Sequence, residues 1–205
     1  MKLYKFLYKL LAPLLRFIFN VHPHGLENIP DEGGLLICPN HMAAVDVIIV
    51  ACVVRTRQIR FMAKAELFKV PLLGGLIKAL GAYPIRRGEG DVGAIKKTIT
   101  LLKEGNTVGM FPQGTRFKGV DPHNSTVKHG AGMIAHRGGV PVLPVAIITK
   151  GYKVSLFKRV DVIFGKPISP DDLGFESGNR AEQIAASEKI FTEILKLHEA
   201  AENNS

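Results

Sequence analysis

The sequence predicts an α/β fold, with a mostly parallel sheet flanked by helices and an N-terminal amphipathic helical element that binds a membrane. Short apolar runs typical of buried strands alternate with segments of helical periodicity, and no internal repeat is evident. The 205 residues suit one domain with an appendage, and a hydrophobic content of 46% is enough for a core. We therefore expect an interfacial helical segment over residues 1–21 and one globular domain over residues 22–205.

The expected strands are short and rich in aliphatic residues, and they lie at 34–38, 59–63, 82–85, 107–111, 141–147, 153–156 and 159–164. Pro39 ends the first of them because proline has no N–H for the ladder. Helices are expected at 43–54, 70–80, 129–136 and 180–201. A further helix is capped by Asp91 and stopped by Gly105, and its expected apolar face consists of Val92, Ile95, Ile99 and Leu102.

Residues 2–21 form a strongly apolar opening with a basic stripe. Its basic residues fall on one helical face and are Lys2, Lys5, Lys9 and Arg16. Pro13 is expected to kink or split the helix near Ala12. The apolar part is wider than ordinary docking requires, which favours a helix lying in the bilayer interface over one that only covers the core. Residues 22–25 are interpreted as a linker.

We expect a peripheral protein on the cytoplasmic face of the cell membrane. The apolar stretches are shorter than the ~18–20 residues that cross a bilayer, and no small-residue cleavage site follows the opening segment. Cys38 and Cys52 both lie in apolar runs, which is typical of reduced, buried thiols.

The net charge of +9 is unevenly distributed, because the N-terminal half is basic and residues 171–205 are acidic. This asymmetry indicates a basic face that meets an anion, such as phospholipid, a phosphorylated substrate, an acidic partner or nucleic acid. The basic residues lack the interleaved aromatic residues of a stacking surface, so we expect no nucleic acid partner.

A candidate catalytic pair follows the expected strand at 34–38. His41 lies just past the strand end, and Asp46 lies five residues further on. An imidazole can act as a general base, and a carboxylate on its other ring nitrogen fixes the tautomer. No Ser, Thr or Cys lies between them, which favours a nucleophile that belongs to the substrate. The alternative is that Asp46 merely caps the next helix.

Cations and a glycine-containing turn follow three other expected strands. They are Lys64, the Arg86–Arg87 pair and the Gly114-Thr115-Arg116 turn. The carboxyl ends of parallel strands meet at one edge of a sheet, so these groups would surround the His41–Asp46 pair. Guanidinium groups and glycine backbones suit phosphate, although any single arginine could be a solvated surface residue. The sequence therefore predicts a phosphate-binding catalytic edge without a metal site.

Four ordered blocks across residues 35–147 resemble the bacterial lysophosphatidic acid acyltransferase family, whose members are 1-acylglycerol-3-phosphate acyltransferases. The blocks are Asn40–Asp46 with its Asn-His-x4-Asp pattern, Gly81–Arg87, Phe111–Arg116 and Val140–Val145. The resemblance implies that His41 is the general base toward the sn-2 hydroxyl of lysophosphatidic acid, and that Asp46 orients it.

The resemblance also implies roles for the strand-end residues. Arg87, Gly114, Thr115 and Arg116 would bind the glycerol phosphate, and Lys64 would assist there or at the oxyanion. The implied co-substrate is acyl-CoA or an acylated carrier protein, with no cofactor, and the lipids come from an anionic phospholipid membrane surface.

One position departs from the family pattern, since Gln113 stands where the family usually has Glu. An amide keeps hydrogen-bonding reach but carries no charge. Two other functions stay open at this point. The first is acyl transfer to another lysophospholipid or to glycerol 3-phosphate, and the second is non-catalytic binding of membrane lipids.

Overall fold

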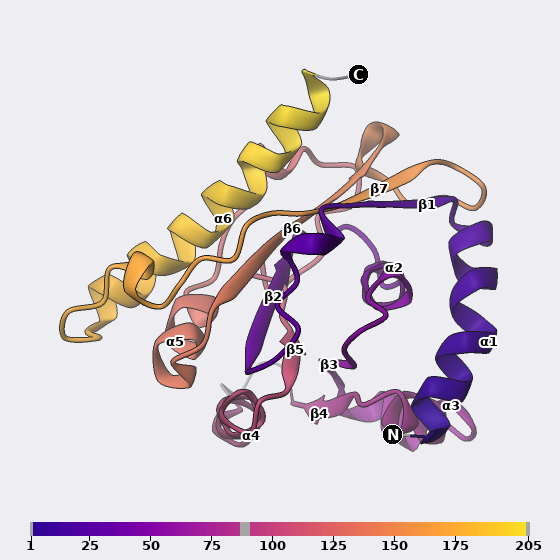
Figure 1. The fold of residues 1–205 in the computed structure, drawn as a ribbon, viewed down its shortest axis with the longest axis horizontal. Coiled ribbons are helices and arrows are strands. Elements are labelled where there is room, and N and C mark those ends of the chain that lie inside the picture. The colour runs from indigo at the N-terminus through magenta and orange to yellow at the C-terminus, as the bar shows by residue number, and fades with distance from the viewer. Residues whose placement is uncertain (1, 87–90, 204–205) are drawn as a thin grey trace.

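The computed structural model describes residues 2–86 and 91–203. These residues fold around a central seven-stranded sheet (Figure 1). The strand order is β1-β7-β6-β2-β5-β3-β4. In chain order the strands are β1 (Val21–His24), β2 (Leu35–Pro39), β3 (Ile59–Lys64), β4 (Tyr83–Ile85), β5 (Thr107–Gly109), β6 (Val142–Thr149) and β7 (Val160–Phe164). The five strands from β6 to β4 run parallel to one another, while β7 is antiparallel to β6 and parallel to β1. The predicted α/β fold with a mostly parallel sheet is therefore confirmed.

Helices cover both faces of the sheet. They are α1 (Lys2–Ile18), α2 (Asp46–Val53), α3 (Leu73–Ala79), α4 (Val92–Lys103), α5 (Gly130–Gly138) and α6 (Arg180–Glu202). Figure 1 shows α1 and α2 on one face and α4, α5 and α6 on the other. Because both faces are covered, β2 is apolar at every position: Leu35 and Ile37 pack toward α2, and Leu36 and Cys38 pack toward α5 and α6.

The predicted Asp91 cap forms: its carboxylate accepts a hydrogen bond from the Ala94 N–H at 2.9 Å and begins α4. At the start of α6, which had no predicted cap, Oδ1 of Asn179 accepts from the Glu182 N–H at 3.0 Å and satisfies one N–H that the helix leaves free. The Asn179 amide also donates to the Glu182 carboxylate at 2.7 Å. Gly139 ends α5 in a left-handed conformation, with φ of 62°.

Two local predictions were wrong. The expected linker at 22–25 is largely the edge strand β1, where Pro23 is tolerated because it lies at the margin of the sheet. Residues 153–156 form no strand and instead follow a 3-10 turn at Lys150–Tyr152. Of the kink or split expected at Pro13, the split does not occur, because α1 continues to Ile18.

The predicted face of α4 was also wrong in part. Val92 is 62% exposed, whereas Ala94, Thr98, Leu101 and Leu102 are buried. A hydrogen bond of 2.7 Å between the Tyr83 and Thr98 hydroxyls joins the buried side of α4 to β4.

Helix α1 packs on α2 with one side and leaves the other side exposed. The Tyr8 hydroxyl donates to the Cys52 carbonyl at 2.9 Å, and Ala12 is buried in the core. The outer side carries four exposed apolar residues, Phe6, Leu10, Leu14 and Phe17. Among the described residues, no helix combines the length and apolarity needed to cross a bilayer. The chain division at residue 21 stays a prediction.

Candidate active site

The His41–Asp46 pair forms at the carboxyl end of β2. The Nδ1 of His41 lies 2.8 Å from Oδ2 of Asp46, the first residue of α2. The same oxygen accepts backbone hydrogen bonds from Met42 at 2.6 Å and Ala43 at 2.7 Å. Asp46 is completely buried and His41 is 6% exposed. The carboxylate thus holds Nδ1 as a donor, which leaves Nε2 as the ring atom that can accept a proton.

Two aromatic rings fix the plane of the imidazole. Phe111 stacks on His41 with ring centroids 3.8 Å apart and planes 15° apart, and Phe61 stacks on Phe111 at 5.9 Å. Phe61 can reach this position because residue 109 is glycine: a Cβ there would overlap the Phe61 ring. Gly109 is therefore required by the packing around His41.

Asn40 anchors the His41 turn to β6 and was missed as a positioning residue. Its side-chain amide donates to the Ile147 carbonyl at 3.1 Å and accepts from the Ile147 N–H at 2.7 Å. This buried amide continues the β2–β6 pairing one residue beyond Pro39, which has no N–H to give. In the sequence, the only indication of this role for Asn40 was its position next to His41 in the first block.

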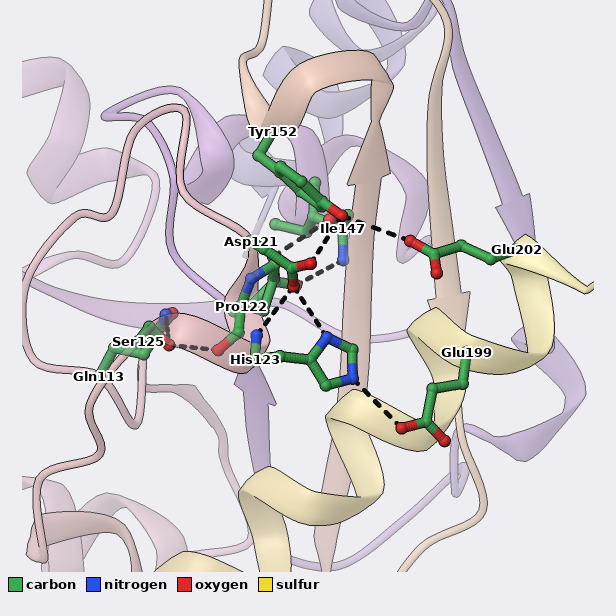
Figure 2. Close-up of polar contacts among 10 residues, drawn as sticks. Gln113, Asp121, Pro122, His123, Ser125, Ile147, Tyr152, Glu199 and Glu202 are labelled. Carbon is green, nitrogen blue, oxygen red and sulfur yellow. Dashed lines mark hydrogen bonds and ion pairs between the residues drawn. The ribbon is translucent and has the colours of Figure 1, made fainter.

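Gln113 holds the backbone of His41 from the opposite side. Its Oε1 accepts the His41 backbone N–H at 2.5 Å, and its Nε2 donates to the Ser125 hydroxyl at 2.7 Å. Ser125 in turn donates to the Pro122 carbonyl at 2.7 Å (Figure 2). The His41 carbonyl accepts from the Phe117 N–H at 2.9 Å. Both backbone groups of His41 are therefore bound by the loop that follows β5.

A polar cluster ties this loop to α6 (Figure 2). Asp121 accepts from the His123 backbone N–H at 2.9 Å and contacts the His123 ring at 2.8 Å. The other ring nitrogen of His123 lies 3.2 Å from Glu199 of α6, and the Tyr152 hydroxyl donates to Asp121 at 3.0 Å. The hydrogen bond from the His123 backbone lowers the pKa of Asp121, and the Asp121 side chain raises the pKa of His123. The cluster thus fixes the 3-10 turn Pro122–Asn124 that supports Ser125.

His41 opens onto a cavity of about 360 Å³ at the carboxyl edge of the sheet. Arg86, which follows β4, and Gly114, in the loop after β5, line the same cavity. Much of the remaining wall is apolar and includes Met62, Ile85, Met110 and Met133. Three of the four strand ends that were expected to meet, those of β2, β4 and β5, therefore contribute a predicted residue to this cavity.

The other predicted phosphate-binding residues are placed differently. Lys64 is exposed and forms a 3.5 Å ion pair with Glu66. Thr115 and Arg116 are exposed and are not among the lining residues of the cavity. Arg87 lies outside the described residues. Within those residues, no group of three or more His, Cys, Asp or Glu side chains could hold a metal ion.

A second cavity, apolar and about 220 Å³ in volume, lies between α1, α2 and α3. Phe61 lines both this cavity and the His41 cavity. Leu11, Val47 and Ile77 represent the three helices in its wall.

A buried imidazole–carboxylate pair without its own nucleophile, at the edge of a parallel sheet, suits transfer of a group to a substrate hydroxyl. Residues 20–148 match a family model described as Acyltransferase. The chain belongs to the acyltransferase family and is an O-acyltransferase.

Two relatives and one solved structure show which acyltransferases this chain is similar to. The 1-acyl-sn-glycerol-3-phosphate acyltransferase of Bacillus subtilis (strain 168) is 34% identical over 196 residues, covering 95% of this chain and 96% of the relative. The enzyme of that name from Streptococcus pneumoniae (strain ATCC BAA-255 / R6) is 35% identical over 185 residues, covering 88% and 67%. The crystal structure of the 1-acyl-sn-glycerophosphate (LPA) acyltransferase PlsC from Thermotoga maritima is similar, with a TM-score of 0.67 and 27% identity, covering 96% of this chain and 79% of that one.

Proposed function

We propose that this enzyme transfers an acyl chain from an acyl thioester to the sn-2 hydroxyl of 1-acyl-glycerol 3-phosphate and forms phosphatidic acid. The observation that carries the proposal is the His41–Asp46 pair at a cavity that also contains Arg86 and Gly114. The names of its relatives support 1-acyl-glycerol 3-phosphate as the acceptor.

In the proposed mechanism, Nε2 of His41 removes the proton of the sn-2 hydroxyl as the oxygen attacks the thioester carbonyl. Asp46 accepts the Nδ1–H hydrogen bond and stabilises the imidazolium. The tetrahedral intermediate then collapses, the carbon–sulfur bond breaks, and the thiolate takes the proton from His41. The ester and the free thiol are the products, so no acyl-enzyme forms.

We assign the acceptor phosphate to the part of the cavity lined by Arg86 and Gly114, although Asp91 also lines the cavity. Thr115, Arg116, Arg87 and Lys64 are further candidates. We assign an acyl chain to the apolar cavity between α1, α2 and α3, whose wall includes Phe61. The donor is acyl-CoA or an acylated carrier protein, and neither is favoured by the residues described.

The proposed setting is the cytoplasmic face of the cell membrane, with α1 lying in the interface. Its exposed apolar side, Phe6, Leu10, Leu14 and Phe17, supports this position. Substrate and product are both lipids, so a bound enzyme would exchange them without exposing their chains to water.

The test is an acyl-transfer assay with purified protein, in which lysophosphatidic acid, glycerol 3-phosphate and another lysophospholipid compete as acceptors for acyl-CoA and acyl-carrier protein. We expect lysophosphatidic acid to be preferred, and His41→Ala to lower kcat by about 10²–10⁴-fold. His24→Ala is the matched control, because His24 is exposed and ends β1, at the opposite edge of the sheet. Unchanged transfer by His41→Ala would refute the catalytic assignment.

A further inference from the structure

A third cavity is a cleft between α1 and the carboxyl end of α2. Its volume is about 510 Å³, and it shares no lining residue with the His41 cavity. Lys9 and Arg16 of α1 and Arg55, just after α2, line it, and no acidic residue does. Among the described residues these three cations form no ion pair with a carboxylate.

Two of these cations, Arg16 and Arg55, lie near the Tyr8 side chain. Tyr8 lines the cleft and donates to the Cys52 carbonyl at 2.9 Å. Burial raises the pKa of Tyr8, the neighbouring Cys52 adds to this, and the charges of Arg55 and Arg16 oppose it. Both guanidinium groups therefore lie within electrostatic range of the same atom. Like charges gathered in this way repel one another, and an anion between them would relieve the repulsion.

The position of the cleft on α1 indicates where such an anion would come from. With about 100° of rotation per residue, Lys5, Lys9 and Arg16 lie roughly a third of a turn around the helix from the exposed apolar stripe. That stripe consists of Phe6, Leu10, Leu14 and Phe17. When the stripe lies in the acyl region of a bilayer, the basic side lies at the depth of the headgroups.

We propose that the cleft bounded by Lys9, Arg16 and Arg55 is an anion-binding site for one phosphate group, separate from the catalytic cavity. The favoured source is the phosphodiester of a membrane phospholipid, and free inorganic phosphate is the other source of the same chemistry. The lipid source rests on the proposed membrane position of α1, whereas the anion site does not.

Isothermal titration calorimetry on the full chain tests the site without any acyl donor, so its result is independent of acyl transfer. The probes are inorganic phosphate, dihexanoyl-phosphatidylglycerol below its aggregation concentration, and dihexanoyl-phosphatidylcholine. Arg16→Gln and Arg55→Gln each remove one cleft cation. Lys5→Gln is the matched control, because Lys5 is exposed on the same side of α1 and does not line the cleft. Thermal unfolding of each variant verifies its fold.

We expect phosphatidylglycerol to bind, and each arginine substitution to weaken binding by about tenfold or more, as loss of a charge-assisted hydrogen bond does. Lys5→Gln should change the affinity less than about twofold. Equal binding of inorganic phosphate with the same arginine dependence would support the site and assign it to free phosphate. Equal losses from Lys5→Gln and the arginine variants, or no arginine-dependent binding of either anion, would overturn the proposal. Acyl transfer is assayed separately on the same variants, so failure of the proposed function would be seen independently.

Discussion

The backbone N–H of His41 donates to Oε1 of Gln113 across 2.5 Å, which joins the turn after β2 to the loop after β5. Gln113 is 1% exposed, and its other amide atom donates to Ser125. The Ser125 hydroxyl donates its own hydrogen bond to the Pro122 carbonyl. A glutamate at position 113 would keep the acceptor for His41 but could not donate to Ser125. The amide and the hydroxyl therefore form a matched pair in this chain.

Ser125→Ala should lower kcat about three- to tenfold with little change in KM, because it leaves the buried amide donor of Gln113 unpaired at a cost of ~1–3 kcal/mol and loosens the support of His41. Steady-state kinetics with a varied acceptor would measure both constants. Thr126→Ala is the control, since Thr126 is exposed and neighbours Ser125. A change confined to KM would contradict a positioning role for Ser125.

Asp46→Asn should reduce kcat by about 10²–10⁴-fold while the fold is retained, because a neutral amide oxygen can still accept from His41, Met42 and Ala43 but cannot stabilise the imidazolium as the carboxylate does. The assay is acyl transfer at saturating acceptor, with circular dichroism to verify folding. Asp31→Asn, on an exposed loop, serves as the control. Activity near that of the wild type would remove Asp46 from the mechanism.

Gly109→Ala should destabilise the protein by about 1–3 kcal/mol, because the added Cβ overlaps the Phe61 ring and overpacks the stack on Phe111 and His41. Urea unfolding gives the free energy. Combining it with Phe61→Leu tests the cause, since a smaller side chain at 61 should make the glycine substitution less costly. Strictly additive effects of the two substitutions would show that Phe61 is not the obstacle.

Buried His198 should make stability depend on pH. Burial lowers its pKa to about 4, with a further contribution from His123, against an ordinary value near 6.5. The folded state then binds fewer protons than the unfolded state, so stability is present above about pH 6.5 and is lost as the pH falls toward 4, by ~3 kcal/mol in total. His198→Leu should flatten this loss in urea unfolding between pH 7 and pH 4.

Two other histidines bear on this pH measurement, one as an opposing contribution and one as a control. His123 works in the opposite direction: its pKa is raised by Asp121, so its contribution is present below the unfolded pKa and is lost as the pH rises through the folded value. His129→Gln removes an exposed histidine and is the control. If His198→Leu loses as much stability between pH 7 and pH 4 as the wild type does, the pH dependence belongs to other groups.

Leu14→Ser should weaken binding of the protein to lipid vesicles about tenfold or more, because an apolar side chain of this size contributes ~1.5–3 kcal/mol when it leaves water. Leu14 is 53% exposed on the outer side of α1. Val92→Ser is the control, since Val92 is 62% exposed on α4 at the other face of the sheet. Vesicle co-sedimentation measures both, and equal losses would argue against α1 as the membrane contact.

The sequence predicted the fold class well because burial on both faces of a parallel sheet leaves short continuous apolar runs. It failed where local signals were weak. Pro23 hid the edge strand β1, because proline usually argues against a strand, and only pairing with β7 shows that this edge accepts it. On α4, aliphatic periodicity selected Val92, whereas the buried face includes the polar Thr98, which contacts the Tyr83 hydroxyl.

The sequence by itself determined that His41 and Asp46 lie at the end of a buried strand, because that depends on residue order and strand length. Tertiary structure decided which distant groups reach them. Only the folded chain places Gln113 on the backbone of His41, Asn40 on β6 and Arg86 in the shared cavity, while Lys64 pairs with Glu66. The physical reason is that these contacts depend on strand register, loop path and side-chain direction, all of which are fixed by packing between segments far apart in the chain.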